Sequence, residues 1–406
     1  MDIQAAKELV IKAGKEVVAS GLIARTWGNI SCRIDENQFV ITPSGRPYET
    51  LVPEEIVLVN IADCSYDGNV KPSSEKGIHA AAYKMHPEVN FVIHTHQVEA
   101  SVVSALGFDI NNIDEKNKAI IGDNVPIAAY GLPGTPMLRN GVIAAMQRSD
   151  SKAIIMAHHG ALCLGVDYTD AFSVASALEE VCRNFVQQRF SEIKGRTTEN
   201  LSEALAYIKR RCTEDDYADV PAFAPCNSER VGDCFTISPV DDEKTVYSFD
   251  IASGDLIAGD TYPEAAELHR AIYQKRKDVN YIVQNKSEEA TIVSRTVRKM
   301  KPLLDDFAQL VGVTVRNAAY DKNNQVKSAK KVVKALKGRN AVLLSNNGAL
   351  SVAASEYDAT AVDMVMDKGC KTQLGAMLFN VQKPICPIEA RLMRIIYLKK
   401  YSKQAK

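Results

Sequence analysis

The sequence predicts an α/β fold that occurs twice along one chain. The first observation behind this prediction is the order of hydrophobic patterns, in which short apolar runs typical of buried strands alternate with amphipathic stretches typical of helices. The second is an internal repeat, because shifting the sequence against itself by 190 residues brings identical residues into register. This period is far too long for a solenoid, so we predict that each copy of the repeat forms a complete globular domain.

The expected elements follow the same order in each half. The chain opens with an amphipathic helix, for which Asp2 is a suitable N-terminal cap and Gly21 a suitable end. The order within each half is helix, strand pair, helix, strand, helix, strand and long helix. This order predicts a sheet layered by helices. Strands of the first half are predicted at Phe39–Thr42, Ile56–Ile61, Phe91–His96 and Ala153–Ala157.

Identical residues support the repeat over about a hundred positions. His79 matches His269 and Tyr83 matches Tyr273. Ordered matches of this kind indicate tandem domains rather than coincidence. Further pairs are Val89-Asn90 with Val279-Asn280, Ala128-Ala129-Tyr130 with Ala318-Ala319-Tyr320, and, after a two-residue deletion, Gly160-Ala161-Leu162 with Gly348-Ala349-Leu350.

We therefore predict two domains, residues 1–210 and residues 211–406. The join is expected in the polar, proline-containing stretch Cys212–Arg230. A chain of 406 residues is long enough for two sizeable cores.

The composition argues against several classes of partner. A net charge of −1 gives no attraction to nucleic acid or to an anionic membrane surface, and the basic stretch Lys327–Lys337 has the pattern of a solvated helix face. No apolar run approaches the ~20 residues of a membrane span, and the nine cysteines form no CxxC pair. We expect a cytoplasmic protein with reduced thiols.

Histidines give the strongest chemical signal. Six of the seven precede residue 160. His94 and His96 end a predicted strand, where side chains two residues apart leave the same face about 7 Å from each other. Two such imidazoles can bind one divalent metal if a third ligand is supplied elsewhere. The best candidate is His159, with its neighbour His158 on the other side or among the residues that surround the ligands.

Three further segments allow a structural or a functional interpretation. Ser73-Ser74-Glu75 is a normal start of a helix, but it also offers hydroxyls, helix N–H groups and a carboxylate beside the histidines. The segments Thr26–Ser31 and Ile41–Gly45 are either turns between strands or loops whose backbone N–H groups cradle a phosphate.

Taken in order, these segments resemble the class II aldolase/adducin family, and most closely its fuculose-1-phosphate aldolase branch. The resemblance covers residues 1–190 and reaches the second half only through the repeat. It implies two tandem three-layer α/β/α domains, each with a central, mainly antiparallel sheet. The motifs are Gly28-Asn29-Ile30-Ser31, Ile41-Thr42-Pro43-Ser44-Gly45, Ser73-Ser74-Glu75, His94-Thr95-His96, Tyr130-Gly131 and His158-His159-Gly160.

The resemblance also implies roles for single residues. It makes Zn²⁺, or another divalent metal, the cofactor, held by His94, His96 and His159, and it makes Glu75 the general acid/base. It implies phosphate binding by a set of loop residues, which are Thr26, Asn29, Ser44, Gly45, Ser73 and Ser74. The small-molecule partner would be a sugar phosphate.

A catalytic tyrosine of this family comes from a neighbouring subunit of a ring. Tyr130 and its repeat equivalent Tyr320 both match its position. We expect a homo-oligomer that forms a ring of alternating active and degenerate domains, in which Tyr320 would serve the intact metal site.

The chemical residues of the first half are not repeated. Gln284, Lys286 and Asn347 replace the three histidines, and Ala265 replaces Glu75. Lys286 is either a solvated lysine or an ammonium fixed near the vacated metal position. We predict that residues 211–406 form a degenerate domain without catalysis.

The resemblance leaves three functions open. The first is an aldolase that cleaves a ketose phosphate, expected to be a ketose 1-phosphate, to dihydroxyacetone phosphate and an aldehyde through a metal-stabilised enediolate. The second is a decarboxylase, 4-epimerase or dehydratase of a sugar phosphate on the same scaffold. The third is a non-catalytic, adducin-like interaction protein, which an intact Glu75 and three histidines disfavour.

Overall fold

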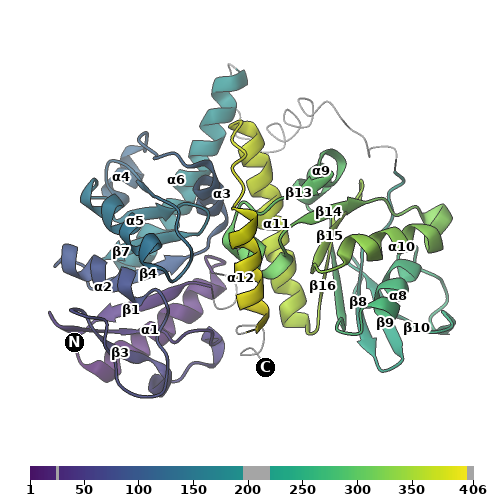
Figure 1. Cartoon of the computed structure of the whole chain (residues 1–406), viewed down its shortest axis with the longest axis horizontal. Coiled ribbons are helices and arrows are strands. Elements are labelled where there is room, and N and C mark those ends of the chain that lie inside the picture. Colours follow the sequence, from purple (N-terminus) through teal and green to yellow (C-terminus); the bar gives the residue numbers. More distant parts are fainter. Residues whose placement is uncertain (24–26, 195–219, 400–406) are drawn as a thin grey trace. The chain divides into compact units, whose positions relative to one another are not determined.

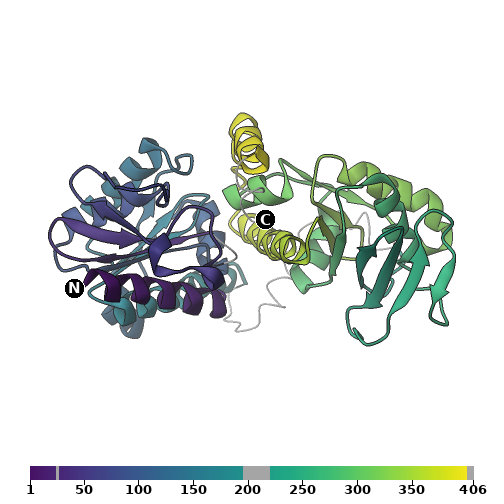
Figure 2. The ribbon, with the colours of Figure 1, turned by 90° about the horizontal axis from the view of Figure 1, so that it is seen from below.

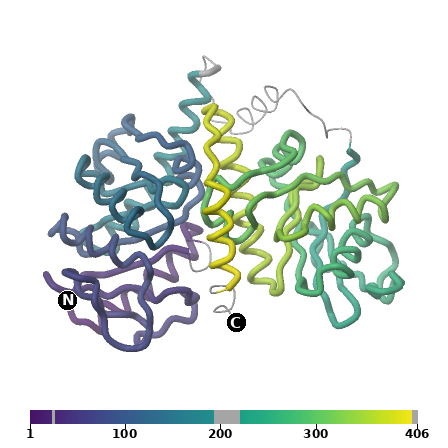
Figure 3. The backbone as a smooth tube through the Cα atoms, in the orientation of Figure 1, coloured from purple at the N-terminus to yellow at the C-terminus, as the bar shows by residue number. Residues whose placement is uncertain are grey.

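The computed structural model describes residues 1–23, 27–194 and 220–399. The chain divides into two compact units, one formed by Met1–Thr197 with Ile396–Lys406 and the other by Thr198–Ile395. Figures 1 and 3 show the first unit, up to residue 194, in purple to teal and the second in teal-green to yellow. The predicted boundary between residues 210 and 211 lies outside the described residues.

A seven-stranded sheet forms the centre of the first unit, in the order β3-β2-β1-β4-β7-β6-β5. All neighbouring strands are antiparallel except β5 and β6, which are parallel. The strands are β1 Asn29–Arg33, β2 Gln38–Ile41, β3 Val57–Asn60, β4 Phe91–Thr95, β5 Ile127–Ala128, β6 Ala153–Met156 and β7 Ala161–Gly165.

Helices cover both faces of this sheet. Alternate residues of β4 show the division, since Phe91 and Ile93 join the core under α1, α3, α4 and α6, whereas Val92 joins the core under α2 and α5. Figure 2 shows α1, in purple, along its side of the sheet. The helices are α1 Ile3–Ala19, α2 Lys76–Met85, α3 Val98–Leu106, α4 Glu115–Ile121, α5 Pro136–Gln147 and α6 Tyr168–Lys194, with the 3-10 turns η1 Tyr48–Thr50 and η2 Pro53–Glu55.

The second unit repeats this plan with an extra strand at each edge. Its sheet has the order β11-β10-β9-β8-β12-β16-β15-β14-β13, and only β14 and β15 are parallel. The strands are β8 Cys226–Val231, β9 Cys234–Pro239, β10 Tyr247–Asp250, β11 Leu256–Ala258, β12 Tyr281–Asn285, β13 Lys299–Met300, β14 Val315–Ala318, β15 Ala341–Leu344 and β16 Ala349–Ala353.

Its helices form the two outer layers. The apolar sides of α8 and α10 pack on one face of the sheet through Leu268, Ile272 and Val332, and α9 and α11 lie on the other face. The elements are α8 Ala266–Lys275, α9 Glu288–Thr296, the π-helical turn η3 Phe307–Val311, the 3-10 turn η4 Lys322–Asn324, α10 Gln325–Leu336, α11 Glu356–Leu378 and α12 Pro387–Lys399, whose residues from Ile396 onward are assigned to the first unit.

The α/β layers predicted from the sequence are confirmed, and each predicted strand of the first half is found within one residue of its expected ends. Asp2 caps α1, because its carboxylate accepts a hydrogen bond from the backbone N–H of Ala5 at 3.0 Å. The join between the two domains was expected over Cys212–Arg230, and the C-terminal end of this predicted range is wrong. Residues Cys226–Val231 form strand β8, in which Cys226 and Ser228 are buried. The mostly polar sequence of this strand gave no strand signal.

No helix among the described residues is both long enough and apolar enough to span a bilayer.

Candidate metal centre

Three histidines converge from two segments of the first unit. His94 lies in β4 and His96 directly follows this strand, while His159 lies in the turn between β6 and β7. All three side chains are buried, with exposed fractions of 1%, 7% and 4%. One ligand nitrogen from each lies within 4.8 Å of the others.

The β6–β7 turn needs an unusual backbone to present His159. His158 adopts a left-handed conformation with φ of 60°, and the Tyr130 ring packs edge-on against its imidazole at 5.4 Å. Gly160 follows, where a Cβ atom would lie 2.2 Å from the carbonyl oxygen of Thr95. His159 therefore joins the cluster, and His158 does not.

The donor set suits a divalent metal. His94 Nδ1 donates to the carbonyl oxygen of Ala161 at 2.9 Å, so its Nε2 presents a lone pair to the cluster. That Nε2 atom lies 3.1 Å from Nε2 of His96. Burial lowers the pKa of His94 well below its ordinary value, which keeps this imidazole neutral. Three converging imidazoles of this kind are a normal zinc ligand set.

Glu75 brings a carboxylate to the same cluster from the start of α2. Its oxygens lie 3.0 Å from His159 Nε2 and 3.4 Å from His94 Nε2, and the Asn29 amide donates to it at 2.9 Å. Burial alone would raise the pKa of this carboxyl, but hydrogen bonds from the His159 side chain and the Asn29 amide favour its charged form, and the pKa lies well below its ordinary value. The carboxylate is ionised and close enough to act beside a metal or to share it.

Hydrogen bonds bring two of the candidate phosphate loops together. The backbone N–H of Ser44 donates to the carbonyl of Lys71 at 3.0 Å, and that of Ser73 donates to the carbonyl of Thr42 at 3.1 Å. The Ser73 hydroxyl accepts from the N–H of Glu75 at 3.2 Å, in the turn that precedes α2. Ser74 is exposed, and Gly45 has a left-handed φ of 73°. Thr26 lies outside the described residues.

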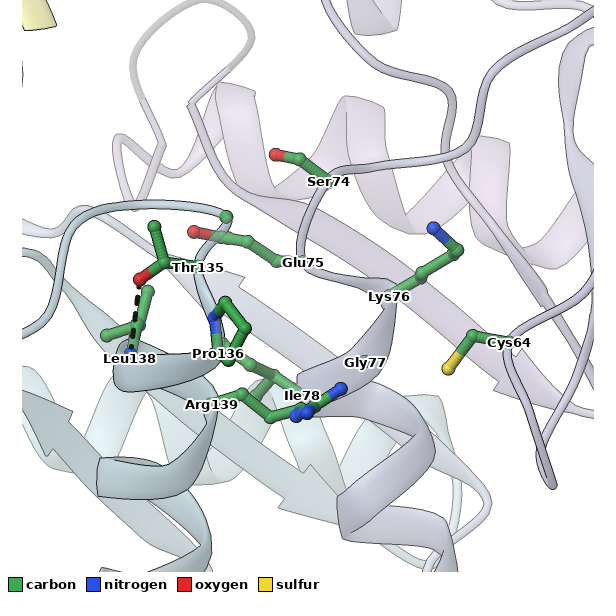
Figure 4. A pocket seen from close by; sticks show the side chains of 11 residues that line it. Cys64, Ser74, Glu75, Lys76, Gly77, Ile78, Thr135, Pro136, Leu138 and Arg139 are labelled. Carbon is green, nitrogen blue, oxygen red and sulfur yellow. Dashed lines mark hydrogen bonds between the residues drawn. The ribbon is translucent and has the colours of Figure 1, made fainter.

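A pocket of about 210 Å³ lies between the starts of α2 and α5. Figure 4 shows Glu75 extending toward the turn at Thr135, and Arg139 running toward Gly77. Lys76 and Arg139 add two positive charges to its lining, and neither has a carboxylate partner among the described residues. Sequence reasoning missed this pocket, because it depends on which helices meet across the sheet.

The two candidate tyrosines differ in exposure. Tyr130 is half-buried beside His158. Tyr320 is fully buried in the core of the second unit, where its hydroxyl donates to the carbonyl of Glu264 at 2.8 Å and its ring packs on Phe223. The catalytic role of either tyrosine stays a prediction.

In the second unit, the side chains that replace the metal ligands form hydrogen bonds to the backbone of residues 221–226. Gln284 Oε1 accepts from the N–H of Cys226 at 3.2 Å, and Lys286 Nζ donates to the carbonyl of Phe223. Asn347 accepts from the N–H of Phe223 at 3.0 Å and donates to the carbonyl of Pro221 at 3.1 Å. The interpretation of Lys286 as a solvated lysine is therefore wrong.

The fold and the site together define a metal-binding α/β domain with an ionised carboxylate beside the ligands. Residues 8–186 and 240–374 match the model of the Class II Aldolase and Adducin N-terminal domain. The chain belongs to this family and carries its domain twice.

The relatives that match this chain include aldolases. A 5-deoxy-D-ribulose 1-phosphate aldolase of Bacillus thuringiensis serovar kurstaki is 32% identical over 190 residues, which are 47% of this chain and 88% of that protein. The L-fuculose phosphate aldolase of Escherichia coli K12 is 33% identical over 177 residues, which are 44% of this chain and 80% of that protein. A solved L-fuculose 1-phosphate aldolase structure has 27% identity and a TM-score of 0.42, covering 45% of this chain and 84% of that chain.

Proposed function

We propose that the first domain is a zinc-dependent class II aldolase that cleaves a ketose 1-phosphate to dihydroxyacetone phosphate and an aldehyde. One observation carries this proposal: the ionised Glu75 carboxylate lies within 3.4 Å of two members of a buried three-histidine cluster. The aldolase names of the relatives support it.

The residues divide the chemistry between them. His94, His96 and His159 would hold the metal, which when bound supplies positive charge for the oxyanion that forms at the substrate carbonyl. In the synthetic direction, the Glu75 carboxylate removes a proton from C3 of dihydroxyacetone phosphate, and C3 then attacks the aldehyde carbon. In cleavage, the C4 hydroxyl loses its proton and becomes the aldehyde carbonyl as the C3–C4 bond breaks with its electron pair staying on C3, and Glu75, protonated at the expense of that hydroxyl, delivers the proton to C3.

An anionic substrate fits the charge around the site. The N-terminus of α2, with Ser73 and Ser74, offers N–H and hydroxyl donors to a phosphate. Lys76 and Arg139 make the adjoining pocket positive. Asn29, Ser44 and Gly45 complete the proposed phosphate site.

A substrate panel tests the proposal. We expect the zinc-loaded protein to release dihydroxyacetone phosphate from at least one ketose 1-phosphate, and Glu75→Gln to lower kcat by about 10²–10⁴-fold while zinc stays bound. No release from any of the sugars would reject the aldolase and point to a decarboxylase, 4-epimerase or dehydratase. A protein that never holds a divalent ion in metal analysis would reject all of these enzymes in favour of an interaction protein.

The proposal includes a homo-oligomeric ring of active and degenerate domains. Mass photometry of the purified chain should give a multiple of the monomer mass, whereas a monomer would reject the ring. If Tyr320 serves the metal site across such a ring, Tyr320→Phe must lower turnover of the zinc-loaded enzyme. Unchanged turnover would leave Tyr130 as the remaining candidate, and Tyr130→Phe tests it in the same assay.

A further inference from the structure

A buried chain of hydrogen bonds runs from the core of the first unit to Glu75. The Ser31 hydroxyl lies 2.7 Å from the Tyr83 hydroxyl and 2.6 Å from His79 Nδ1. His79 Nε2 contacts the Asn29 Oδ1 atom, and Asn29 Nδ2 lies 2.9 Å from Glu75 Oε2. All of these side chains are less than a tenth exposed.

The chemistry of the groups fixes the direction of each bond. The Asn29 amide nitrogen, which can only donate, faces Glu75, and the amide oxygen, which can only accept, faces His79. His79 therefore donates from Nε2, and its Nδ1 accepts from the Ser31 hydroxyl. Burial lowers the pKa of His79 to about 4, which keeps it in this neutral form.

The second unit retains one half of this series of hydrogen bonds and lacks the other half. Ser228 lies 2.7 Å from His269 Nδ1 and 2.8 Å from the Tyr273 hydroxyl, as Ser31 does with His79 and Tyr83. Cys226 stands at the position of Asn29, as the strand registers show. Within the described residues, His269 Nε2 has no hydrogen-bond partner.

The comparison separates two roles of one histidine. The bond from serine to Nδ1 persists where the metal ligands are lost, so it belongs to the packing of the fold. The bond from Nε2 occurs only in the unit that has Glu75. The second unit adopts the same fold without this bond, and in the first unit the bond connects His79 through Asn29 to the metal centre.

We infer that His79 is a positioning residue for the metal centre. By fixing the orientation of the Asn29 amide, it directs the Glu75 carboxylate toward His94 and His159. Hydrogen-bond partners that orient groups at a metal site commonly contribute 10–100-fold to affinity or activity. This inference rests on the proposed function, because the geometry that it protects is that of the general base.

Two substitutions divide the roles of His79. In His79→Asn, the short amide reaches the Nδ1 position and keeps the Ser31 contact, but it loses the donor to Asn29. In His79→Gln, the longer amide places an N–H group near the Nε2 position and keeps that donor. His269→Asn in the second unit is the matched control, since it makes the same change where no Asn29 or Glu75 equivalent exists.

Catalysis should respond differently to the three substitutions. We expect His79→Asn to lower kcat by about 10–100-fold with KM changed less than about threefold, and His79→Gln to recover most of the loss. His269→Asn should leave kcat unchanged although it lowers the thermal stability as much as His79→Asn does. Equal kcat losses in all three variants, or no loss in His79→Asn, would overturn the inference.

The visible spectrum of the Co²⁺-substituted protein provides a test without substrate. We expect His79→Asn to change the Co²⁺ bands, because Glu75 loses its fixed orientation beside the metal, and His79→Gln and His269→Asn to preserve them. An unchanged spectrum in His79→Asn would reject the positioning role whatever the substrate. A wild-type protein with normal Co²⁺ bands and no aldolase activity would reject the proposed reaction while leaving the positioning role supported by the spectra.

Discussion

His94 and Gln284 occupy the same register position in the two sheets. His94 pairs with Leu162 across β4 and β7, and Gln284 pairs with Leu350 across β12 and β16. The turn that follows is repeated as well, since His158 and Asn346 are both left-handed, with φ of 60° and 59°. The backbone frame of the site is thus present twice, and the two copies differ in the side chains that this frame carries.

Metal binding should depend on the first copy only. His159→Ala removes one of three imidazoles, so we expect bound zinc to fall from about one ion per chain to near zero. Activity should fall at least 10³-fold, because several kcal/mol of charge stabilisation are lost. Asn347→Ala makes the matched change in the second unit and should leave the zinc content unchanged. Elemental analysis of both variants checks this, and zinc retained in His159→Ala would contradict the assignment of the ligands.

A second matched pair tests the turn itself. In Gly160→Ala the new Cβ would meet the carbonyl oxygen of Thr95 at 2.2 Å, and in Gly348→Ala it would meet that of Asn285 at 2.0 Å. We expect each variant to lose about 2–4 kcal/mol of unfolding free energy in its own unit, because backbone atoms must move.

Only the change at Gly160 should also reduce zinc affinity, since its Cβ would lie 3.0 Å from His94 Cε1 as well. Calorimetric unfolding together with zinc titration of the two variants distinguishes the effects. A stable Gly160→Ala variant with normal zinc affinity would show that the turn is less constrained than these distances indicate.

The local pattern of the sequence was sufficient to predict the α/β layers and the placement of His94 and His96 on one face of a strand. His94 and His96 end an apolar run whose period of two places them on one face, and the same run forms β4. Strand β8 escaped prediction because Asn, Ser, Glu and Arg dominate Cys226–Val231. Its place in the sheet depends on pairing with β9 and β12, which no local pattern encodes.

The site was harder to predict wherever it depends on tertiary contacts. The match of His79 with His269 was visible in the repeat, but only the structure shows that one of them reaches Asn29. Arg139 lies 63 residues beyond Lys76 in the sequence, so their shared pocket follows from the packing of α2 on α5. The occupation of the second site by residues 220–226 likewise depends on the path of the chain.

The chain segment in the second site should stabilise that unit. Lys286 donates to the carbonyl of Phe223, and its ammonium lies 5.5 Å from the centroid of the Phe223 ring. We expect Lys286→Met to lower the unfolding free energy of the second unit by about 1–3 kcal/mol, because a buried carbonyl loses its charged donor. Lys334→Met, on the exposed side of α10, is the control and should change it by less than about 0.5 kcal/mol. Equal effects of the two variants in urea unfolding would argue against an anchoring role.

Asp363 should make the stability of the second unit depend on pH. It lies one helical turn before Asp367 in α11, and the Asn285 amide donates to its carboxyl at 3.2 Å. Burial and the nearby Asp367 charge raise the pKa of Asp363 from its ordinary value of 3.8 to about 7.

A folded pKa above the unfolded one means that the folded chain binds more protons between these two values. The free energy of unfolding should therefore fall as the pH rises from about 4 to about 7, and this loss should be complete above that range. Asp363→Asn removes the titrating group. We expect it to be more stable than wild type by about 1–3 kcal/mol at pH 8, after allowance for partial exposure, and to differ little at pH 4. Denaturant unfolding at both pH values checks this, with the exposed Glu243→Gln as the control. If the difference in stability between Asp363→Asn and wild type is no larger at pH 8 than at pH 4, Asp363 is ionised in the folded chain at little cost.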